Sequence, residues 1–533
     1  MTYIAEFCIY ASVTGEIQMK LNGKVLKIIA LLYMYIPVMI FMTGYTKWYY
    51  ALAAGLFLFP CLYVYIADKN LFYRKKGDSE YDIDAYMNDD EEADDIRLHP
   101  VALILSVAII TAVCIVVGIG GIFPQAGDWY KHNAVLRDLT NSSWPVYYDR
   151  FDDCMLTYYL GQYLVPAVMG KLFSSFEVSN IAMSVWCIGG LILTYLMLLR
   201  VTKADSLKKQ IPAVLIMLFF CGGLNLAQNI LKQVYGDRMY SLGSYHWVLV
   251  DGIMLQYRSN LVMIRWVLPQ IIVPWLATML FIEDIKRVEY YVIILLPSLL
   301  FGSFSFAALA VIAVINATVL FIKEDVSLKK ILSPCNILPA ICPGIVLFFY
   351  FLGNLQVEKP ISSSFRFQTY EGDHLTVYIV FCLCMFGVYC ICVGKENLKN
   401  PLFCINIGIL LLLPWLRMGL CNDVVMSGSI PSLFILMIYV IRLLFDGREE
   451  TALGIRKGIV LVFLLIGCIY PVKEIADNII WNNPGAELAD SYPTMKWFTK
   501  RGDPNTSEDL MYNYYTYDMD GKIFYEYIAR VKH

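Results

Sequence analysis

Residues 100–123 read PVALILSVAIITAVCIVVGIGGIF and contain no charged side chain. A helix needs about 20 apolar residues to cross the hydrocarbon layer of a membrane, so this stretch is long enough to span it. The rest of the chain is similar, since 58% of its 533 residues are hydrophobic and 16% are charged. Soluble domains carry about 25% charged residues. The composition therefore excludes an ordinary soluble enzyme, a disordered protein and a nucleic-acid-binding protein.

Comparable apolar stretches recur along the chain and predict an all-α polytopic membrane protein with about 13 transmembrane helices. The predicted spans cover residues 25–43, 48–67, 100–123, 178–199, 211–228, 260–282, 289–302, 303–322, 335–353, 375–393, 401–416, 431–446 and 458–475. The two stretches that meet at Phe301-Gly302 also fit one broken helix. Most of the 15 cysteines lie in apolar stretches, where we expect them to act as small apolar residues rather than as metal ligands.

The placement of Lys and Arg predicts the orientation, because basic residues are concentrated on the cytoplasmic side of membrane proteins. Lys20, Lys24 and Lys27 precede or open the first span and predict a cytoplasmic N-terminus. Short basic connections fall on the same side at residues 74–76, 200–209, 286–287, 323–330, 395–399 and 442–457. The external side then receives the loops 124–177, 229–259, 354–374 and 417–430 and the C-terminus. We expect a multi-pass protein of the plasma (inner) membrane.

Segment Thr157–Phe173 is apolar but does not fit this topology as a span. Counting it as a span would move the basic connection 200–209 to the external side. The segment is short and contains Gly161, Pro166 and Gly170. Irregular backbone is not tolerated against lipid, so we expect an interfacial or re-entrant helix that packs on protein at the external face.

The chain divides into three regions by composition. Residues 1–99 contain two predicted spans and an acidic cytoplasmic loop, with ten acids and no Lys or Arg between Asp78 and Asp95. Such a run is typical of a solvated segment. Residues 100–475 form the main transmembrane region, and residues 476–533 form a short external C-terminal cap.

The first external loop, 124–177, is the richest in polar side chains. Asp128, Lys131 and His132 have the spacing of one helix face, and aromatic residues and the pair Asp152-Asp153 follow. Aromatic rings stack on sugars, and a partly desolvated carboxylate can remove a proton from a hydroxyl group. The alternative is an interfacial aromatic belt with ordinary surface charges.

The order of elements in this region resembles the first part of the GT-C glycosyltransferases. A span is followed by the external Asp-x-x-x-His segment at Asp128, an aromatic loop, the short helix Thr157–Phe173 and a span that ends at Leu199-Arg200. The resemblance covers roughly residues 100–200, and it implies that Asp128 is the catalytic acid and that 100–475 is a GT-C-like catalytic domain. The two spans before residue 99 and the acidic loop depart from the family pattern.

Further candidate residues lie in the later external loops. Arg417 follows a predicted span, where a guanidinium can hold a lipid phosphate, and Asn422 or Asp423 would orient the phosphate or the sugar. The alternative for Arg417 is an interfacial arginine that reaches toward water. The candidate substrate-binding residues are Lys131, His132, Tyr148, Asp152, Asp153, Gln162, Arg258, Arg366, Arg417, Asn422 and Asp423.

Together these features predict a glycosyltransferase that acts on the external side of the membrane. It would move sugar, with inversion, from a polyprenyl-phosphate-linked donor to a cell-surface glycan, lipid or protein. We expect membrane lipids but no nucleic acid as further partners. No cofactor is certain, and a divalent cation (Mg²⁺ or Mn²⁺) beside Asp152 or Asp153 stays open. Two alternatives also stay open, a polysaccharide polymerase or ligase and a non-enzymatic exporter of lipid-linked glycans. The sequence has no P-loop, His-Glu-x-x-His or Gly-x-Ser-x-Gly motif.

Overall fold

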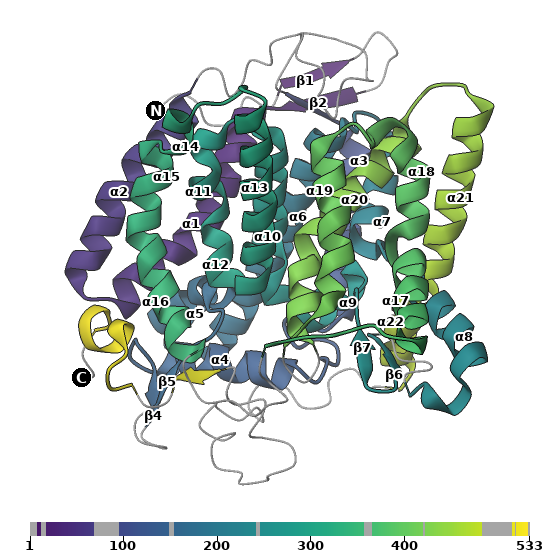
Figure 1. Cartoon of the computed structure of the whole chain (residues 1–533). Helices are drawn as coiled ribbons and strands as arrows, with labels where there is room; N and C mark the ends of the chain where they lie inside the picture. Colours follow the sequence, from purple (N-terminus) through teal and green to yellow (C-terminus); the bar gives the residue numbers. More distant parts are fainter. Residues whose placement is uncertain are drawn as a thin grey trace.

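The computed structural model describes residues 8–11, 17–68, 95–148, 154–240, 246–355, 365–418, 422–481, 514–516 and 519–530. About 75% of the structure is helical, and most of the helices stand side by side between two faces (Figure 1). Among the described residues, eight helices are long and apolar enough to cross a membrane, and two bent helix pairs raise this number to ten. The prediction of an all-α polytopic membrane protein is confirmed at this level.

Each predicted span overlaps at least one helix, although the helix within 100–123 ends at Val116. Five long spans are single helices: α1 (Gly23–Tyr45), α2 (Trp48–Ala67), α6 (Phe176–Thr202), α13 (Ser303–Ile322) and α20 (Asp423–Phe445). Three more spans each consist of consecutive helices. The first contains α14 (Leu328–Ile331), α15 (Pro334–Pro339) and α16 (Ile345–Leu355). The second contains α17 (Asp373–Cys382) and α18 (Val388–Asn397), and the third contains α21 (Thr451–Gly467) and α22 (Ile469–Trp481). Shorter apolar helices are α3 (Pro100–Val116), α11 (Tyr291–Leu295) with α12 (Pro297–Phe301), and α19 (Pro401–Leu412).

Two predicted spans are bent rather than straight. α7 (Leu207–Phe219) and α8 (Leu224–Tyr235) meet at 44°, and α9 (Asn260–Val267) and α10 (Ile272–Glu283) meet at 99°. The predicted span 260–282 is therefore a bent helix pair rather than one straight helix. The break falls at the 3₁₀ turn Leu268–Gln270, where Pro269 lacks the N–H that a continuous helix needs. At Gly302, in contrast, two separate helices meet, since α12 ends at Phe301 and α13 begins at Ser303.

Short strands at both ends of the helices were not predicted from the apolar pattern. β1 (Cys8–Ala11), β2 (Ile17–Leu21) and β3 (Ile96–Leu98) form one antiparallel sheet. The other strands are β4 (Tyr147–Tyr148), β5 (Cys154–Leu156), β6 (Val248–Val250), β7 (Ile253–Leu255), β8 (Arg366–Phe367), β9 (Leu416–Arg417) and β10 (Tyr515–Thr516). They pair as β10-β5-β4, β6-β7 and β8-β9. Residues that are far apart in the sequence are thereby joined.

Figure 1 shows β1 and β2 at one end of the helices, which we call the β2 face. The opposite end, the α4 face, carries α4 (Trp129–Asn141), α5 (Gly161–Phe173) and the strands β4 to β7. Segment Thr157–Phe173 therefore forms the short helix α5 at one face, and α5 packs against α1, α4 and α6. The four predicted external loops contribute to the α4 face through α4, β6, β7, β8 and β9.

Helix α20 occupies the centre of the molecule. Its most apolar stretch is fully buried, as expected for a helix that is apolar on all sides. It packs against α13, α19 and α10, and Phe434 stacks on Trp275 of α10 with ring centroids 5.1 Å apart. Because Asp423 begins this helix, the packing of α20 fixes the position of Asp423 at the α4 face.

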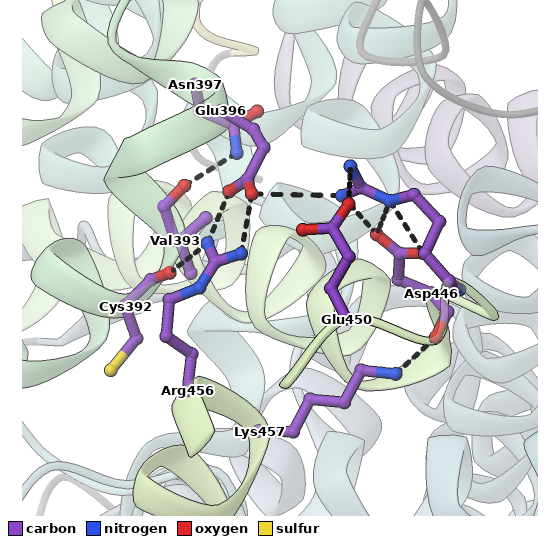
Figure 2. Close-up of polar contacts among 9 residues, drawn as sticks. Cys392, Val393, Glu396, Asn397, Asp446, Glu450, Arg456 and Lys457 are labelled. Carbon is purple, nitrogen blue, oxygen red and sulfur yellow. Dashed lines mark hydrogen bonds and ion pairs between the residues drawn. The ribbon is translucent and has the colours of Figure 1, made fainter. Parts of the chain in front are cut away.

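Charged side chains at the β2 face join helices to one another. Lys27 of α1 lies 3.0 Å from Glu283 of α10, and Arg200 of α6 lies 2.6 Å from the same carboxylate. Figure 2 shows a second cluster, in which Arg456 of α21 makes two hydrogen bonds of 2.6 Å to Glu396 of α18. Lys27, Arg200 and Arg456, which the sequence predicts on the cytoplasmic side, are therefore ion-pair partners that fasten the helix ends.

Candidate functional site

Asp128 precedes the first turn of α4 at the α4 face. Its carboxylate lies 2.8 Å from the ammonium group of Lys131, and 34% of the Asp128 side chain is exposed. The i, i+3 spacing on one helix side explains why the two groups meet. A negative charge is also stabilised at a helix N-terminus by the helix dipole. The predicted proximity of Asp128 and Lys131 is confirmed.

The ionisation of Asp128 is set by opposing influences. Burial raises the pKa of Asp128, but the charge and the hydrogen bond of Lys131, with smaller effects of His132 and Arg258, lower it by more, so the pKa falls below that of an ordinary aspartate. Asp128 is therefore a carboxylate at neutral pH. It can accept a hydrogen bond or a proton, and it cannot donate one.

Arg258 and Asp423 complete a group that we call the Asp128 cluster, together with Asp128 and Lys131. Electrostatic interactions link Asp423 with Arg258, Lys131 and Asp128, and Arg258 also acts on Asp128. Arg258 is buried, and its Nε donates to Gln256 Oε1 at 3.1 Å. Two carboxylates and two cations from α4, α20 and the segment after β7 thus meet at one face.

His132 lies one turn into α4 and is buried. Its Nε2 is 3.1 Å from the carbonyl oxygen of Trp266, which can only accept, so Nε2 carries the proton. Its Nδ1 then accepts from the hydroxyl of Tyr163 of α5 at 2.6 Å. Burial lowers the pKa of His132 to about 4. These contacts favour a role in fixing α4 between α5 and α9 over direct contact with a substrate.

A second layer of charge lies behind α4 and was missed in the sequence. Arg265 of α9 pairs with Glu474 of α22 at 3.2 Å, and both side chains are more than 90% buried. Glu474 Oε1 also accepts from Trp266 Nε1 at 2.6 Å, and Trp129 Nε1 of α4 donates to the carbonyl oxygen of Arg265 at 2.7 Å. An arginine within a predicted span such as 260–282 needs a polar or charged partner. Nothing in the sequence near Glu474 marks it as that partner.

The C-terminal segment contributes an aromatic side chain that sequence reasoning also missed. Tyr514 stacks on Tyr158 at 4.2 Å between ring centroids, and the Lys131 ammonium lies 5.7 Å from the Tyr514 ring centre. Thr157 N–H donates to the Tyr514 carbonyl at 2.8 Å, which continues the pairing of β10 with β5. The tail is Tyr-rich, but no local pattern tells which tyrosine reaches Lys131.

Arg366 and Arg417 form a pair of their own. β8 and β9 pair so that these two residues stand directly opposite each other, and like charges in that position are destabilising unless an anion lies between them. Arg417 Nη1 donates to the Gly252 carbonyl at 2.7 Å. Burial, followed by the charge of Arg366, lowers the pKa of Arg417. Met418, the residue after Arg417, accepts a hydrogen bond from Asp423 N at 2.9 Å, so the backbone connects this pair to the start of α20.

Three other predicted site residues, Asn422, Tyr148 and Gln162, have protein partners. Asn422 Nδ2 donates to Met254 O at 3.2 Å and its Oδ1 accepts from Met418 N at 3.3 Å, so Asn422 fixes the start of α20. Tyr148 donates to Asp138 at 2.7 Å. Gln162 is fully buried, and its Nε2 is 3.2 Å from Cys187 Sγ. Asp152 and Asp153 lie outside the described residues.

The described part of the chain contains no group of three His, Cys, Asp or Glu side chains that could hold a metal ion. A cavity of about 490 Å³ lies at the far end of α13, at the β2 face, and is lined by Phe321, Ile322, Glu324, Val326 and Ser327. It is remote from Asp128. The chemistry available at the α4 face is therefore that of carboxylates, cations and aromatic rings.

Fold and site together define the class: an all-α polytopic membrane protein with a charged, partly exposed cluster at one membrane face. Comparison with protein-family models, with curated proteins and with solved structures gives no match. The function therefore has to be argued from the Asp128 cluster itself.

Proposed function

We propose that the protein is a membrane-embedded, GT-C-like glycosyltransferase that takes sugar from a polyprenyl-phosphate-linked donor. The observation that carries the proposal is the Asp128 cluster, in which a partly exposed, ionised carboxylate is paired with Lys131 and lies within electrostatic range of Arg258 at the end of the transmembrane helices. In a donor of this kind the lipid chain lies within the membrane, and the phosphate and the sugar lie at the depth of the lipid headgroups. The cluster offers a cation for the phosphate and a base for the acceptor at that depth.

The proposed roles follow from charge and exposure. Asp128 accepts the proton of the acceptor hydroxyl while the acceptor oxygen attacks the anomeric carbon of the sugar. The bond from that carbon to the phosphate oxygen breaks, the configuration inverts, and the lipid phosphate leaves. Lys131 and Arg258 stabilise the negative charge that grows on the leaving phosphate. The Arg366–Arg417 pair is the second candidate for holding a phosphate, because two opposed guanidinium groups favour an anion.

The topology belongs to the same proposal. The protein has about 13 transmembrane helices if the shorter apolar helices and bent pairs each cross the membrane. The β2 face is cytoplasmic and the α4 face is external, in the plasma (inner) membrane, as the short basic connections favour. The acceptor is then a glycan, lipid or protein at the cell surface.

The test is sugar transfer by purified protein in lipid nanodiscs with a panel of synthetic polyprenyl-phosphate monosaccharides. We expect Asp128→Asn to lower the rate by about 10²–10⁴-fold, the usual contribution of a general base. Asp205→Asn is the matched control, because this exposed carboxylate pairs with Lys209 at the β2 face. Full activity of the Asp128→Asn variant, or no transfer by the wild-type protein from any donor, would contradict the proposal.

A further inference from the structure

Two cysteines from distant parts of the chain meet near the α4 face. Cys221 follows α7 and Cys468 lies between α21 and α22, and their sulfur atoms are 3.7 Å apart. Cys221 is 4% exposed and Cys468 is half-buried. The sulfur atoms of a disulfide are about 2 Å apart, so the two thiols are in contact but not bonded.

The backbone around the two cysteines holds them together. A Cβ on Gly467 would lie 2.8 Å from Cys221 Sγ and 2.8 Å from the Gly222 carbonyl oxygen. The two chain segments are therefore in direct contact. The Cys468 thiol lies 3.4 Å from the Phe219 carbonyl oxygen, and Asn225 Nδ2 donates to Ile466 O at 3.0 Å. The approach of Cys221 and Cys468 thus follows from close packing between segments 219–225 and 464–468.

Both thiols lie toward the α4 face. The 13 residues of α7 rise about 20 Å from the β2 face, and the 17 residues of α21 rise about 25 Å. The hydrocarbon layer is about 30 Å thick. With the orientation proposed above, the pair is near the external side, where disulfides form and persist.

We infer that Cys221 and Cys468 form a dithiol–disulfide site that joins the α7–α8 junction to the α21–α22 junction. The oxidant is a disulfide compound on the external side. The Cys468 thiolate, the more exposed of the two, attacks the oxidant and forms a mixed disulfide while one thiol leaves. The Cys221 thiolate then attacks Cys468 Sγ, the new S–S bond forms, and the second thiol of the oxidant leaves with its electron pair and takes up a proton.

The bond would act on the candidate site through α22. Glu474 lies on α22, beyond Cys468, and holds Arg265 and Trp266 of α9. Fixing the start of α22 to the end of α7 would limit the movement of Glu474. The inferred disulfide between Cys221 and Cys468 depends on the proposed orientation of the protein in the membrane. It does not depend on the proposed sugar transfer.

Trypsin offers a direct test, because it releases peptides 210–232 and 458–473, each with a single cysteine. Detergent-solubilised protein is incubated with oxidised glutathione, free thiols are blocked with N-ethylmaleimide, and the digest is analysed by mass spectrometry. We expect the two peptides joined, lighter than their sum by two hydrogen atoms, and separated by dithiothreitol. The linked species should persist in Cys404→Ser, a variant of an exposed cysteine of α19, and vanish in Cys468→Ser. Recovery of both wild-type peptides only as N-ethylmaleimide adducts would overturn the inference.

Discussion

Glu474→Ala is the variant for which the structure gives the clearest energetic expectation. The Glu474 carboxylate pairs with Arg265 at 3.2 Å and accepts from Trp266 Nε1 at 2.6 Å. The side chains of Glu474 and Arg265 are 8% and 9% exposed. The substitution therefore removes a buried negative charge and leaves a buried positive charge and an indole N–H without this acceptor.

Breaking a buried ion pair by removing one partner costs about 3–5 kcal/mol, because the remaining charge stays in a poorly solvated place. The hydrogen bond from the indole to a charged acceptor is worth about 1.5–3 kcal/mol. The two terms share one carboxylate and do not add. We expect Glu474→Ala to lower the free energy of unfolding by about 3–5 kcal/mol.

A double-mutant cycle separates the ion pair from general loss of packing. Glu474→Leu, Arg265→Met and the double variant are unfolded in mixed micelles of increasing SDS content, with Trp fluorescence as the signal. Hydrophobic replacement of a whole buried ion pair is often neutral or stabilising. We therefore expect the double variant to be more stable than either single variant, with a coupling energy above about 1.5 kcal/mol.

The matched control is the exposed pair Lys209–Asp205, whose atoms lie 3.1 Å apart while the side chains are 31% and 55% exposed. Pairs of this kind contribute about 0.3–0.5 kcal/mol. The reasoning is refuted if the Glu474 and Arg265 effects add within about 0.5 kcal/mol, or if Glu474→Leu is no more destabilising than Lys209→Ala.

Three further predictions concern single positions. Burial lowers the pKa of His132 to about 4, so the unfolded chain binds the His132 proton more readily than the folded protein does. The free energy of unfolding should therefore fall as the pH is lowered from about 6.5 to about 4. In His132→Gln the melting temperature should depend less steeply on pH over this range. Gly222→Ala should lower the melting temperature because its Cβ would overlap the Met385 backbone, whereas Gly189→Ala, with open space, should raise it slightly. Tyr514→Phe should keep the proposed sugar transfer. Tyr514→Ala should shift the acid limb of the pH–rate profile to higher pH, because a less firmly held Lys131 lowers the pKa of Asp128 less.

The helices could be predicted from the sequence because the apolar length of a span is a local property. Stretches such as 178–199 and 303–322 are long enough by themselves, and each lies within one helix, α6 or α13. The 99° bend between α9 and α10 was missed although Pro269 marks it. A proline in an apolar run can be accommodated, as Pro431 is inside α20, so the residue alone does not distinguish a kink from a continuous helix.

The candidate site could be predicted only where its residues are neighbours in the chain. Asp128 and Lys131 were expected together because helical spacing joins positions three apart. Arg366 and Arg417 were chosen separately, and their cross-strand contact depends on strands of two residues each. Glu474 and Tyr514 come from segments that reach the site only through the packing of α22 and β10. Contacts of this range leave no periodic pattern in the sequence.

Exposure distinguishes Asp128 from Glu283, a carboxylate at the β2 face that also lies beside cations. Glu283 and Lys27 at the β2 face are 13% and 4% exposed, and Glu283 already has both Lys27 and Arg200 as partners. A ligand would have to displace one of these ion pairs to reach that carboxylate. Asp128 has a comparable partner in Lys131 but keeps 34% of its side chain exposed, so a ligand can reach it without breaking the ion pair. Glu283 is thus held by ion pairs that fasten helices, whereas Asp128 keeps an accessible charge, which is why we place the chemistry at Asp128.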